Sequence, residues 1–456
     1  MRACLATAAF LKVHSEERAP KPFSLKENGI LYRTGRHSMR NAALVGITYI
    51  PFGLYNGFVA IAMPFLLTAR GMPLDHVLAL QFFILLPSFL SFLVTPLVDC
   101  GISRRAWAML CSGIAGAALL SGVLMLDAVA RGTTALFVTV MLLGYLAAQM
   151  FSSAMGGMIP NLVAEEHTGT VSAWLNTAYL GGSGIGGWLG SVLVPRLGLS
   201  PAAVVLGLVV FAPCLLLLII GAEHRTPRGA GETMRRLMPD IWAVSRTRSA
   251  IVGLLTFVTP SATFAAQNSF SGLGRDFHAG DVAVTWITGW GSAILCSAGA
   301  MLGGWLVQRK SWNRKGWNMD RRMVFVGTGV VAAFASLGMA FGSPTPAVFF
   351  AGTAVYYILA GINYSAASAV AFDIMGVNNP LSATQYAMLM AACNLAIETV
   401  LKGDQWGYKH GSARGLLLTD AAFSLVIGSI MLTVIHLWGG TGREQVVSIP
   451  AATEMI

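Results

Sequence analysis

The feature of this sequence that most limits its fold is a series of long apolar runs separated by short polar connections. The hydrocarbon core of a bilayer is about 30 Å thick, so a helix that crosses it needs about 20 mainly apolar residues. Twelve runs meet this requirement. We expect helices at approximately residues 42–66, 77–98, 106–126, 136–155, 171–194, 202–220, 250–270, 282–307, 323–341, 347–372, 384–401 and 416–438.

The composition agrees with a chain whose main solvent is lipid. Hydrophobic residues make up 55% of the sequence and charged residues only 11%, whereas a soluble domain has about 25% charged residues. The 51 glycines are typical of membrane helices, which use small residues to pack closely. We therefore predict an all-α integral membrane protein of twelve helices, with the lipid bilayer as its partner.

The basic residues predict how the chain is oriented in the membrane. Eight lie before the first run, two between the second and third, six between the sixth and seventh, six between the eighth and ninth, and one in the tail, against seven in the alternate loops. By the positive-inside rule, this excess places both termini in the cytoplasm. The net charge of +10 therefore indicates membrane topology, and we expect no nucleic-acid partner.

The longest connection divides the twelve runs into two groups of six. We predict a cytoplasmic tail (1–40), a six-helix bundle (41–221), a linker (222–249), a second bundle (250–438) and a cytoplasmic tail (439–456). A weak repeat supports the division, because residues 169–175 and 383–389 share a small-Thr-x-x-Ala-x-Leu pattern at equivalent places in the two bundles. Two such halves are typical of secondary transporters. Met39 is an alternative start, which would make residues 1–38 a non-native extension.

Several other classes of protein lack support in the sequence. No GxxxxGK[ST] loop is present, so ATP is not expected to drive the chain. The six cysteines have no metal-binding spacing and the eight histidines form no HxxxH pair, so we expect no metal, no cofactor and no enzyme activity. A membrane-embedded transferase and a transport-dead sensor of solute remain alternatives.

One carboxylate inside a predicted helix is the first candidate for proton coupling. Glu398 lies 14 residues after Thr384, or about 21 Å into the membrane at 1.5 Å per residue, with Asn394 one turn earlier. A carboxyl group away from water holds a proton more readily than one in water. The alternative is that Glu398 is solvated near the outer interface or paired with Lys402. Asp420 is expected at the interface.

Polar residues recur within the predicted helices of both halves. Polar groups in a membrane helix usually face the bundle interior, where they bind one another, water or a solute. They therefore predict a central cavity, although each one alone is more often a contact between helices. The candidates are Asn56, Gln81, Gln149, Asn176, Tyr179, Gln267, Asn268, Asn363, Tyr364 and Asn394.

A short loop after the second run carries a candidate gate. Asp99 ends this run, and Arg104 with Arg105 follows. An acidic residue with a nearby basic pair can form a salt bridge that breaks when the halves rock. The arginines alone would also be explained as a topology signal. Close helix packing is expected at Gly182 and Gly186 and at Gly299 and Gly303, either as sliding surfaces or as static contacts.

Four segments resemble a known family. Residues 92–99, 162–169, 299–309 and 382–389, the last containing Ser-Ala-Thr-Gln-Tyr-Ala, are similar to segments of bacterial muropeptide permeases. These belong to the peptide, acetyl-CoA and drug transporter family of the major facilitator superfamily. The resemblance implies a multi-pass protein of the bacterial inner membrane that carries bulky amphiphilic solutes by alternating access, usually with protons.

The sequence also departs from the muropeptide permeases. Their acidic residues in the fourth and seventh helices are missing here, where residues 149–157 and 261–264 contain none. We therefore expect a monomeric secondary transporter for a medium-sized organic solute, a muropeptide or a siderophore, in which Glu398 carries the coupling or no proton is coupled. The direction of transport stays open.

Overall fold

A computed structural model describes residues 34–219, 248–308 and 320–438, together with 231, 232, 235, 236 and 239. The predicted tails and linker lie largely outside these residues. The part described is helical and contains no β-strand. Residues 40–456 form one compact unit, and only this unit is considered below.

The first half of the unit contains six long helical segments, of which all but α9 are long and apolar enough to cross a membrane. Two of them are interrupted: the first passes through a π-helical turn, and the second breaks into short pieces at Pro87 and Pro96, since proline cannot donate the helical hydrogen bond. The elements are α2 (Thr34–Gly57), η1 (Phe58–Ala62), α3 (Met63–Thr68), α4 (Leu74–Leu85), α5 (Pro87–Leu90), η2 (Ser91–Leu93), η3 (Thr95–Leu97), α6 (Arg104–Leu124), α7 (Leu126–Ala130), α8 (Thr134–Leu162), η4 (Glu165–His167), α9 (Thr168–Leu197), α10 (Leu199–Phe211) and η5 (Ala212–Leu218).

The second half repeats this arrangement with different interruptions. Its elements are α12 (Arg248–Val258), η6 (Ala265–Ser269), α13 (Phe270–Leu273), η7 (Gly274–Phe277), α14 (Asp281–Trp286), η8 (Ile287–Gly291), α15 (Ser292–Leu306), α17 (Arg321–Phe341), α18 (Pro346–Met375), α19 (Ser382–Ala422), η9 (Phe423–Ile427) and α20 (Gly428–Trp438). Nine helices of the part described are long and apolar enough to cross a membrane. The chain is therefore a multi-pass membrane protein.

The predicted helix at 250–270 is wrong as a continuous element. α12 ends at Val258, just before Pro260, and the chain resumes as the 3₁₀ turn η6 only after Phe264. Phe264 has a left-handed backbone with φ of 53°, a conformation that costs most residues about 1–2 kcal/mol. This break brings irregular backbone into the interior of the second half.

The predicted helix at 384–401 also differs from the structure, because it continues past Lys402. α19 contains a sharp turn at Gly411 and Ser412, whose backbone angles are not helical. The turn divides α19 into two antiparallel limbs, 382–410 and 413–422. Asp404 therefore lies within a helix and not in an exposed loop.

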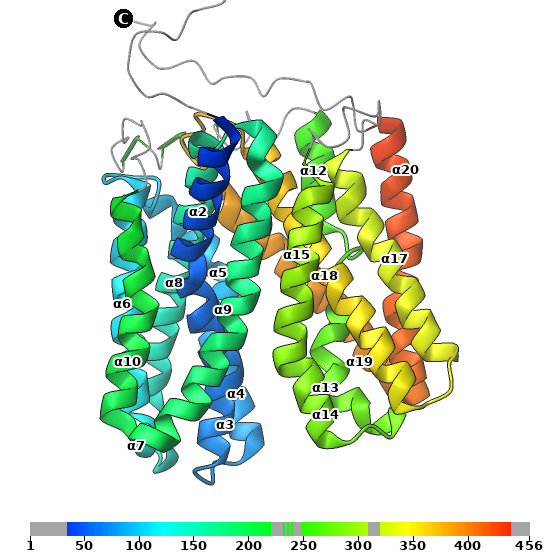
Figure 1. The fold of residues 1–456 in the computed structure, drawn as a ribbon, viewed down its shortest axis with the longest axis horizontal. Coiled ribbons are helices and arrows are strands. Elements are labelled where there is room, and N and C mark those ends of the chain that lie inside the picture. Colours follow the sequence, from blue (N-terminus) through cyan, green and yellow to red (C-terminus); the bar gives the residue numbers. More distant parts are fainter. Residues whose placement is uncertain are drawn as a thin grey trace, which may run out of the picture. The chain divides into compact units, whose positions relative to one another are not determined.

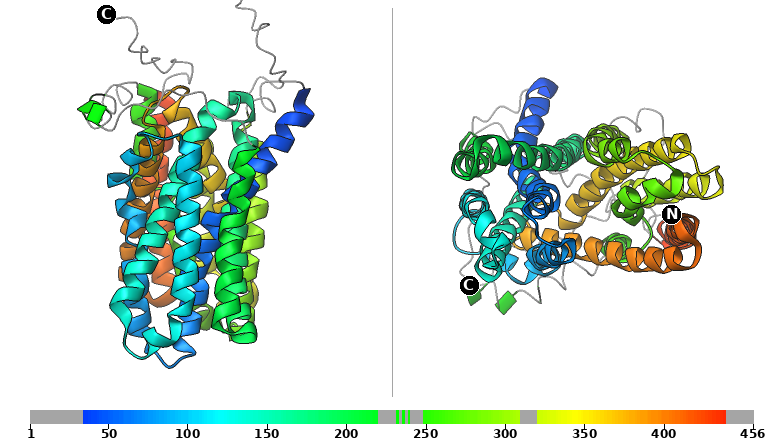
Figure 2. Two further views of the ribbon diagram at one scale, coloured as in Figure 1. Left: turned by 90° about the vertical axis from the view of Figure 1, so that its left-hand side faces the viewer. Right: turned by 90° about the horizontal axis from the view of Figure 1, so that it is seen from below.

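The helices of each half pack mainly on one another (Figure 1). α6 contacts α8 and α10 in the first half, and α18 contacts α15 and α17 in the second. The halves meet through α9 with α15 and through α8 with α19, as the view along the helices also shows (Figure 2). We call the end at which α6 begins and α20 ends the proximal end, and the opposite end the distal end.

The glycine faces pack within each half. A Cβ atom at Gly186 would lie 2.2 Å from the Leu54 carbonyl of α2, and one at Gly299 would lie 2.1 Å from the Ile358 carbonyl of α18. Only glycine allows such close backbones. These contacts fit the static interpretation of the faces, since neither joins the two halves.

Candidate functional site

A buried ion pair lies at the proximal end, in the loop singled out by the sequence. The Arg104 guanidinium donates from Nε to Asp99 Oδ1 at 2.8 Å, and its NH2 atom lies 2.7 Å from the same oxygen. Both side chains are 0% exposed. Buried charges require a partner, and each of these residues finds one within its own loop.

The same pair also binds the other half of the molecule. Asp99 Oδ2 accepts hydrogen bonds from the Thr384 backbone N–H at 2.8 Å and the Thr384 hydroxyl at 2.7 Å. Arg104 donates to the carbonyl oxygens of Asn379 at 3.0 Å and Pro380 at 3.1 Å. These groups belong to the connection between α18 and α19 and to the start of α19. The loop therefore clamps the two halves together at this end.

Two further contacts join the halves at the proximal end. The Thr170 hydroxyl donates to Gln308 Oε1 at 2.5 Å, and the Asn378 backbone N–H donates to Asn161 Oδ1 at 2.7 Å. Thr170 and Thr384 are the matching threonines of the predicted sequence repeat, and each binds a residue that follows a helix of the other half. Arg105 is half-buried beside this clamp.

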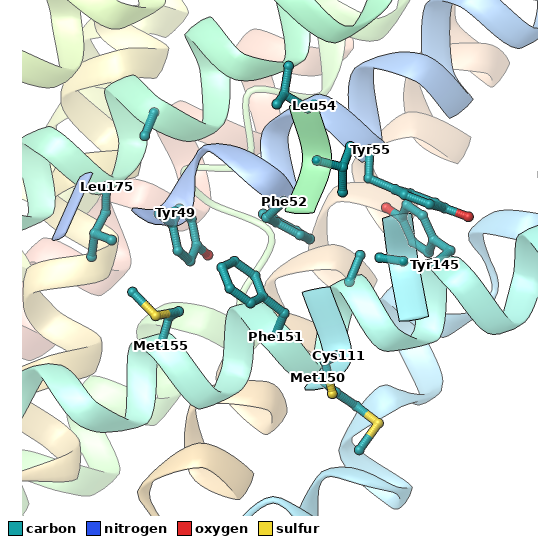
Figure 3. Close-up of a cluster of buried hydrophobic side chains, with 14 of the residues drawn as sticks. Tyr49, Phe52, Leu54, Tyr55, Cys111, Tyr145, Met150, Phe151, Met155 and Leu175 are labelled. Carbon is teal, nitrogen blue, oxygen red and sulfur yellow. The ribbon is translucent and has the colours of Figure 1, made fainter. Parts of the chain in front are cut away.

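Aromatic residues of α2 and α8 gather in the middle of the first half (Figure 3). Tyr49 stacks on Phe151 with ring centroids 6.1 Å apart and shares a 2.5 Å hydrogen bond with Ser152. Phe52 lies next to Tyr49, at a centroid distance of 5.6 Å. The cluster combines flat apolar faces with hydroxyl groups, a combination that suits an amphiphilic ligand.

The cluster continues across the boundary between the halves. Phe52 stacks on Tyr179 at 5.1 Å, and Tyr179 meets the ring of Tyr364 edge-on at 6.5 Å. The Tyr364 hydroxyl accepts a 3.1 Å hydrogen bond from Gln267 Nε2. Asn176 Nδ2 donates to Ser368 Oγ at 2.9 Å. Four of the predicted cavity residues thus meet at one place.

A second row of polar contacts runs beside the first. The Tyr145 hydroxyl donates to Asn56 Oδ1 at 3.0 Å and accepts from Ser88 Oγ at 3.3 Å. Asn394 Nδ2 of the second half donates to the Ser88 carbonyl at 3.0 Å. Gln149 also lies beside the Tyr145 hydroxyl. We call these two rows together the central cluster.

The distal end of the second half contains two cavities. One has a volume of about 570 Å³ and is lined by the broken helix and by α19, including Asn268, Gln405 and Lys409. The other, of about 540 Å³, lies over Arg275 and Asp281. Both cavities therefore lie at the end opposite the clamp.

Comparison with known proteins now decides the family. The sequence model of the Major Facilitator Superfamily matches residues 45–398, more than three quarters of the chain. The chain belongs to the major facilitator superfamily. No curated protein matches the sequence.

Solved structures of transporters share this fold. The human organic anion transporter MFSD10 (TETRAN) has a TM-score of 0.62 at 16% identity, over 88% of this chain and 100% of that one. A bacterial homologue of the iron transporter ferroportin, in an outward-facing state with soaked iron, gives 0.61 at 17% over 86% and 98%. The proton:xylose symporter XylE gives 0.60 at 9% over 89% and 97%. At these identities the likeness concerns the fold alone.

Three predicted cavity residues lie elsewhere in this major facilitator fold. Gln81 donates to the Ala60 carbonyl at 3.4 Å within the first half. Asn363 is 5% exposed and joins α18 to α17 through the Phe325 carbonyl and the Thr328 hydroxyl. Asn268 is exposed in the larger distal cavity. These amides stabilise the helices or line the larger distal cavity, and they do not join the central cluster.

The carboxylates of α19 are arranged differently from the sequence prediction. Glu398 is half-buried and has no hydrogen bond or ion pair within the part of the chain described, and thus no pairing with Lys402. Asp420 is 1% exposed and lies inside the helix bundle, and its interfacial depth stays a prediction. Asp404 is 0% exposed and was missed, because the predicted helix ended before it.

Tyrosines of the central cluster were missed for a different reason. Tyr49, Tyr145 and Tyr386 lie in apolar runs, where an aromatic residue gives no polar signal. The structure describes no group of three or more metal-ligating side chains among the residues it covers.

Proposed function

We propose that this major facilitator protein is a secondary active transporter that moves a medium-sized amphiphilic organic solute by alternating access, with protons as the coupling ion. The observation that carries the proposal is the central cluster, in which aromatic faces and hydrogen-bonding groups of both halves meet beneath a closed clamp. Muropeptides and siderophores are the solutes we favour, because both combine flat or apolar portions with many polar groups.

Three further observations support twelve membrane crossings. The last of the nine apolar helical stretches, Ser382–Trp438, contains the turn at Gly411 and Ser412 and so supplies two crossings. α9 has 30 residues, about 45 Å at 1.5 Å per residue, which is long enough to cross. The broken segment from α12 to η7 supplies one more. An even number of crossings is consistent with termini on one side.

The distribution of basic residues supports a cytoplasmic proximal end. On this assignment Asp99, Arg104 and Arg105 form a cytoplasmic gate that is shut, and the distal cavities open to the outside. The protein would then be in an outward-facing state of the bacterial inner membrane, acting as a monomer.

Uptake into membrane vesicles tests the solute class. Vesicles from a bacterial host that produces the protein are given a labelled muropeptide or a labelled ferric siderophore, with and without an imposed pH gradient. We expect gradient-dependent accumulation of one of them. A solute that binds but is never exchanged across the membrane would instead favour the sensor alternative, and accumulation that ignores the gradient would remove proton coupling.

Glu398→Gln tests the predicted coupling residue. Because glutamine cannot carry a proton, we expect gradient-driven uptake to fall by about tenfold or more, while exchange of solute at equal pH continues. Glu232→Gln is the matched control, since Glu232 is exposed and pairs with Arg236 on its own helical turn. Unchanged pH-dependent uptake in Glu398→Gln would remove this residue from the mechanism.

A further inference from the structure

Two aspartates face each other inside the hairpin formed by the two limbs of α19. The limbs pack closely, because a Cβ atom at Gly403 would lie 3.4 Å from the Thr419 side chain. Asp404 and Asp420 directly follow these two residues, and their charges interact. Both are buried, with 0% and 1% exposure.

Asp420 is held by hydrogen-bond donors from three other elements. Ser336 Oγ of α17 donates to its Oδ2 at 2.7 Å. The Tyr356 hydroxyl of α18 donates to its Oδ1 at 3.1 Å. The backbone N–H of Ala266, in the broken helix, also faces this carboxylate. Donors arranged in this way stabilise an ionised carboxylate.

Asp404 has the opposite environment. Within the described residues neither of its carboxylate oxygens has a hydrogen-bond partner, although both are buried. An ionised carboxylate without donors is among the most costly groups to bury, and it avoids this cost by taking up a proton. A protonated Asp404 carries its own donor, which it can direct towards the neighbouring Asp420.

No cation offsets the two acids within the part of the chain described. Neither aspartate has an ion pair there. The basic residues of the same hairpin, Lys402, Lys409 and Arg414, are exposed, and Arg414 lies over the Phe341 ring at 4.9 Å. From α17 and α18, the side-chain groups seen to bind the pair in the described part of the chain are the hydroxyls of Ser336 and Tyr356.

The larger distal cavity gives the pair a route to water. Its walls include Gln405, the residue after Asp404, together with Tyr408 and Lys409 one turn further along the same limb. Leu416 of the second limb also lines it. A proton that reaches this cavity from the distal side therefore arrives beside the hairpin.

We infer that Asp404 and Asp420 form a carboxyl pair that binds one exchangeable proton, taken from the distal cavity. The role of this proton site in coupling protons to solute transport rests on the proposed function. Binding adds the proton to Asp404, which removes the repulsion between the two carboxylates, and the remaining negative charge stays on Asp420, whose donors are already in place. Release to the cavity restores two carboxylates that repel each other.

The broken helix connects this site to the central cluster. Ala266 faces Asp420, and the next residue, Gln267, donates to the Tyr364 hydroxyl. Loss of the proton would draw the Ala266 backbone and Tyr356 more strongly to the pair. A shift of η6 would then reach Gln267 directly, which links proton occupancy to the solute-contacting residues.

Infrared titration of the purified protein tests the site without any solute. A protonated carboxylic acid has a C=O stretch separate from that of a carboxylate. We expect this band to persist in the full-length protein at neutral pH and to disappear in Asp404→Asn. In Asp420→Asn, we expect it to shift in frequency, since Asp404 loses its acidic neighbour. Asp75→Asn, at a side chain 79% exposed, should leave the band unchanged.

Further measurements decide between a proton and a metal cation. The titration is repeated in sodium chloride and in choline chloride. The inference would be overturned if Asp404→Asn and Asp420→Asn both gave the same band as the unsubstituted protein. It would also be overturned by a band that sodium removes at constant pH, because such a band would indicate a sodium site. If Asp404→Asn does not remain monodisperse in size-exclusion chromatography, Tyr356→Phe serves instead and should shift the band.

The outcome is independent of whether the proposed function holds. A pH-sensitive band that Asp404→Asn removes, in a protein that accumulates no solute, would keep the proton site and reject transport. Gradient-driven uptake by a protein in which Asp404→Asn leaves the band unchanged would keep transport and reject the site.

Discussion

Arg104 is the largest of the fully buried side chains in the part of the chain described. Its guanidinium binds Asp99 within its own loop and carbonyl oxygens of Asn379 and Pro380 in the other half. Guanidinium donors are fixed in a planar fork, so these contacts exist together only when the halves are closed at the proximal end. If that end opens, the ion pair between Asp99 and Arg104 stays intact, because both residues belong to one loop. Water then replaces the Asn379 and Pro380 carbonyl oxygens as the acceptor for Arg104.

Arg104→Gln should weaken the closed proximal end. The substitution leaves Asp99 buried with the Thr384 donors but without its cation, and breaking a buried pair in this way typically costs about 3–5 kcal/mol. We expect a lower thermal stability and more reaction of proximal residues with a thiol reagent added from the cytoplasmic side. Arg70→Gln is the control, since Arg70 pairs with the half-exposed Asp127 and such pairs contribute about 0–1 kcal/mol. Equal effects of the two substitutions would contradict the role of the clamp.

Only some residues of the site could be predicted from the sequence. Asp99 and Arg104 were found because an acidic residue at the end of a predicted membrane helix lies five residues before a basic pair. Their main partner, Thr384, lies 285 residues away in sequence, and a single sequence contains no signal for such a pairing. Tyr49 and Tyr386 were not found because the partners of their hydroxyls, Ser152 for Tyr49 and Ser368 for Tyr386, lie far from them in the sequence or on another helix.

At the scale of helices, α15 and α18 show how small residues determine packing. A Cβ atom at Gly361 would lie 2.0 Å from the Cys296 carbonyl, and one at Gly303 would lie 2.7 Å from the Ile362 backbone. Repeated contacts of this kind let the backbones touch along much of their length. The spacing of these glycines was readable in the sequence, but their partner helix was not.

Gly299→Ala should therefore destabilise the second half. The added methyl group would meet the Ile358 carbonyl at 2.1 Å, and relief of such overpacking typically costs about 1–3 kcal/mol. Thermal unfolding in detergent measures the loss. Gly338→Ala on α17 is the matched control, because no atom lies within 4 Å of its Cβ position. It should have no effect or stabilise by up to about 1 kcal/mol. A Gly299→Ala protein as stable as Gly338→Ala would contradict the packing.

The predicted helices agree with the structure where apolar length alone determines them. Apart from the predicted 77–98 helix, which breaks at Pro87 and Pro96, the exceptions are the break after Val258 and the extension of α19 to the turn at Gly411. Both depend on tertiary contacts: buried donors stabilise the broken helix, and the second limb covers Asp404. A prediction from hydropathy ends the membrane helix before Asp404, because hydropathy contains no information on the second limb of α19, which shields this charge.

At the scale of the whole unit, the two ends are unequal. Contacts at Asp99, Gln308 and Asn378 join the halves at the proximal end, whereas the two cavities described above lie at the distal end. The central cluster lies between them. If the halves rock as rigid bodies, closing the distal end requires these proximal contacts to break together.

A disulfide across the proximal end tests this rocking. Asn161 and Asn378 already share a hydrogen bond between the halves, so Asn161→Cys with Asn378→Cys should be close enough to oxidise. The native reporter is Cys393, which is half-buried near Tyr179 and Tyr364. The other cysteines of the part described are buried, and Cys4→Ser removes the remaining thiol.

The oxidised protein should be held with its distal end open. We expect an impermeant maleimide applied from the outside to label Cys393 at least as fast as in the reduced protein, while uptake stops until a reductant is added. Each single cysteine variant serves as a control. Asn378→Cys alone also reports the cost of replacing Asn378, whose φ of 58° favours asparagine. Continued transport by the cross-linked protein would show that the proximal end need not open, and labelling of Cys393 from the cytoplasmic side alone would reverse the assignment of the two ends.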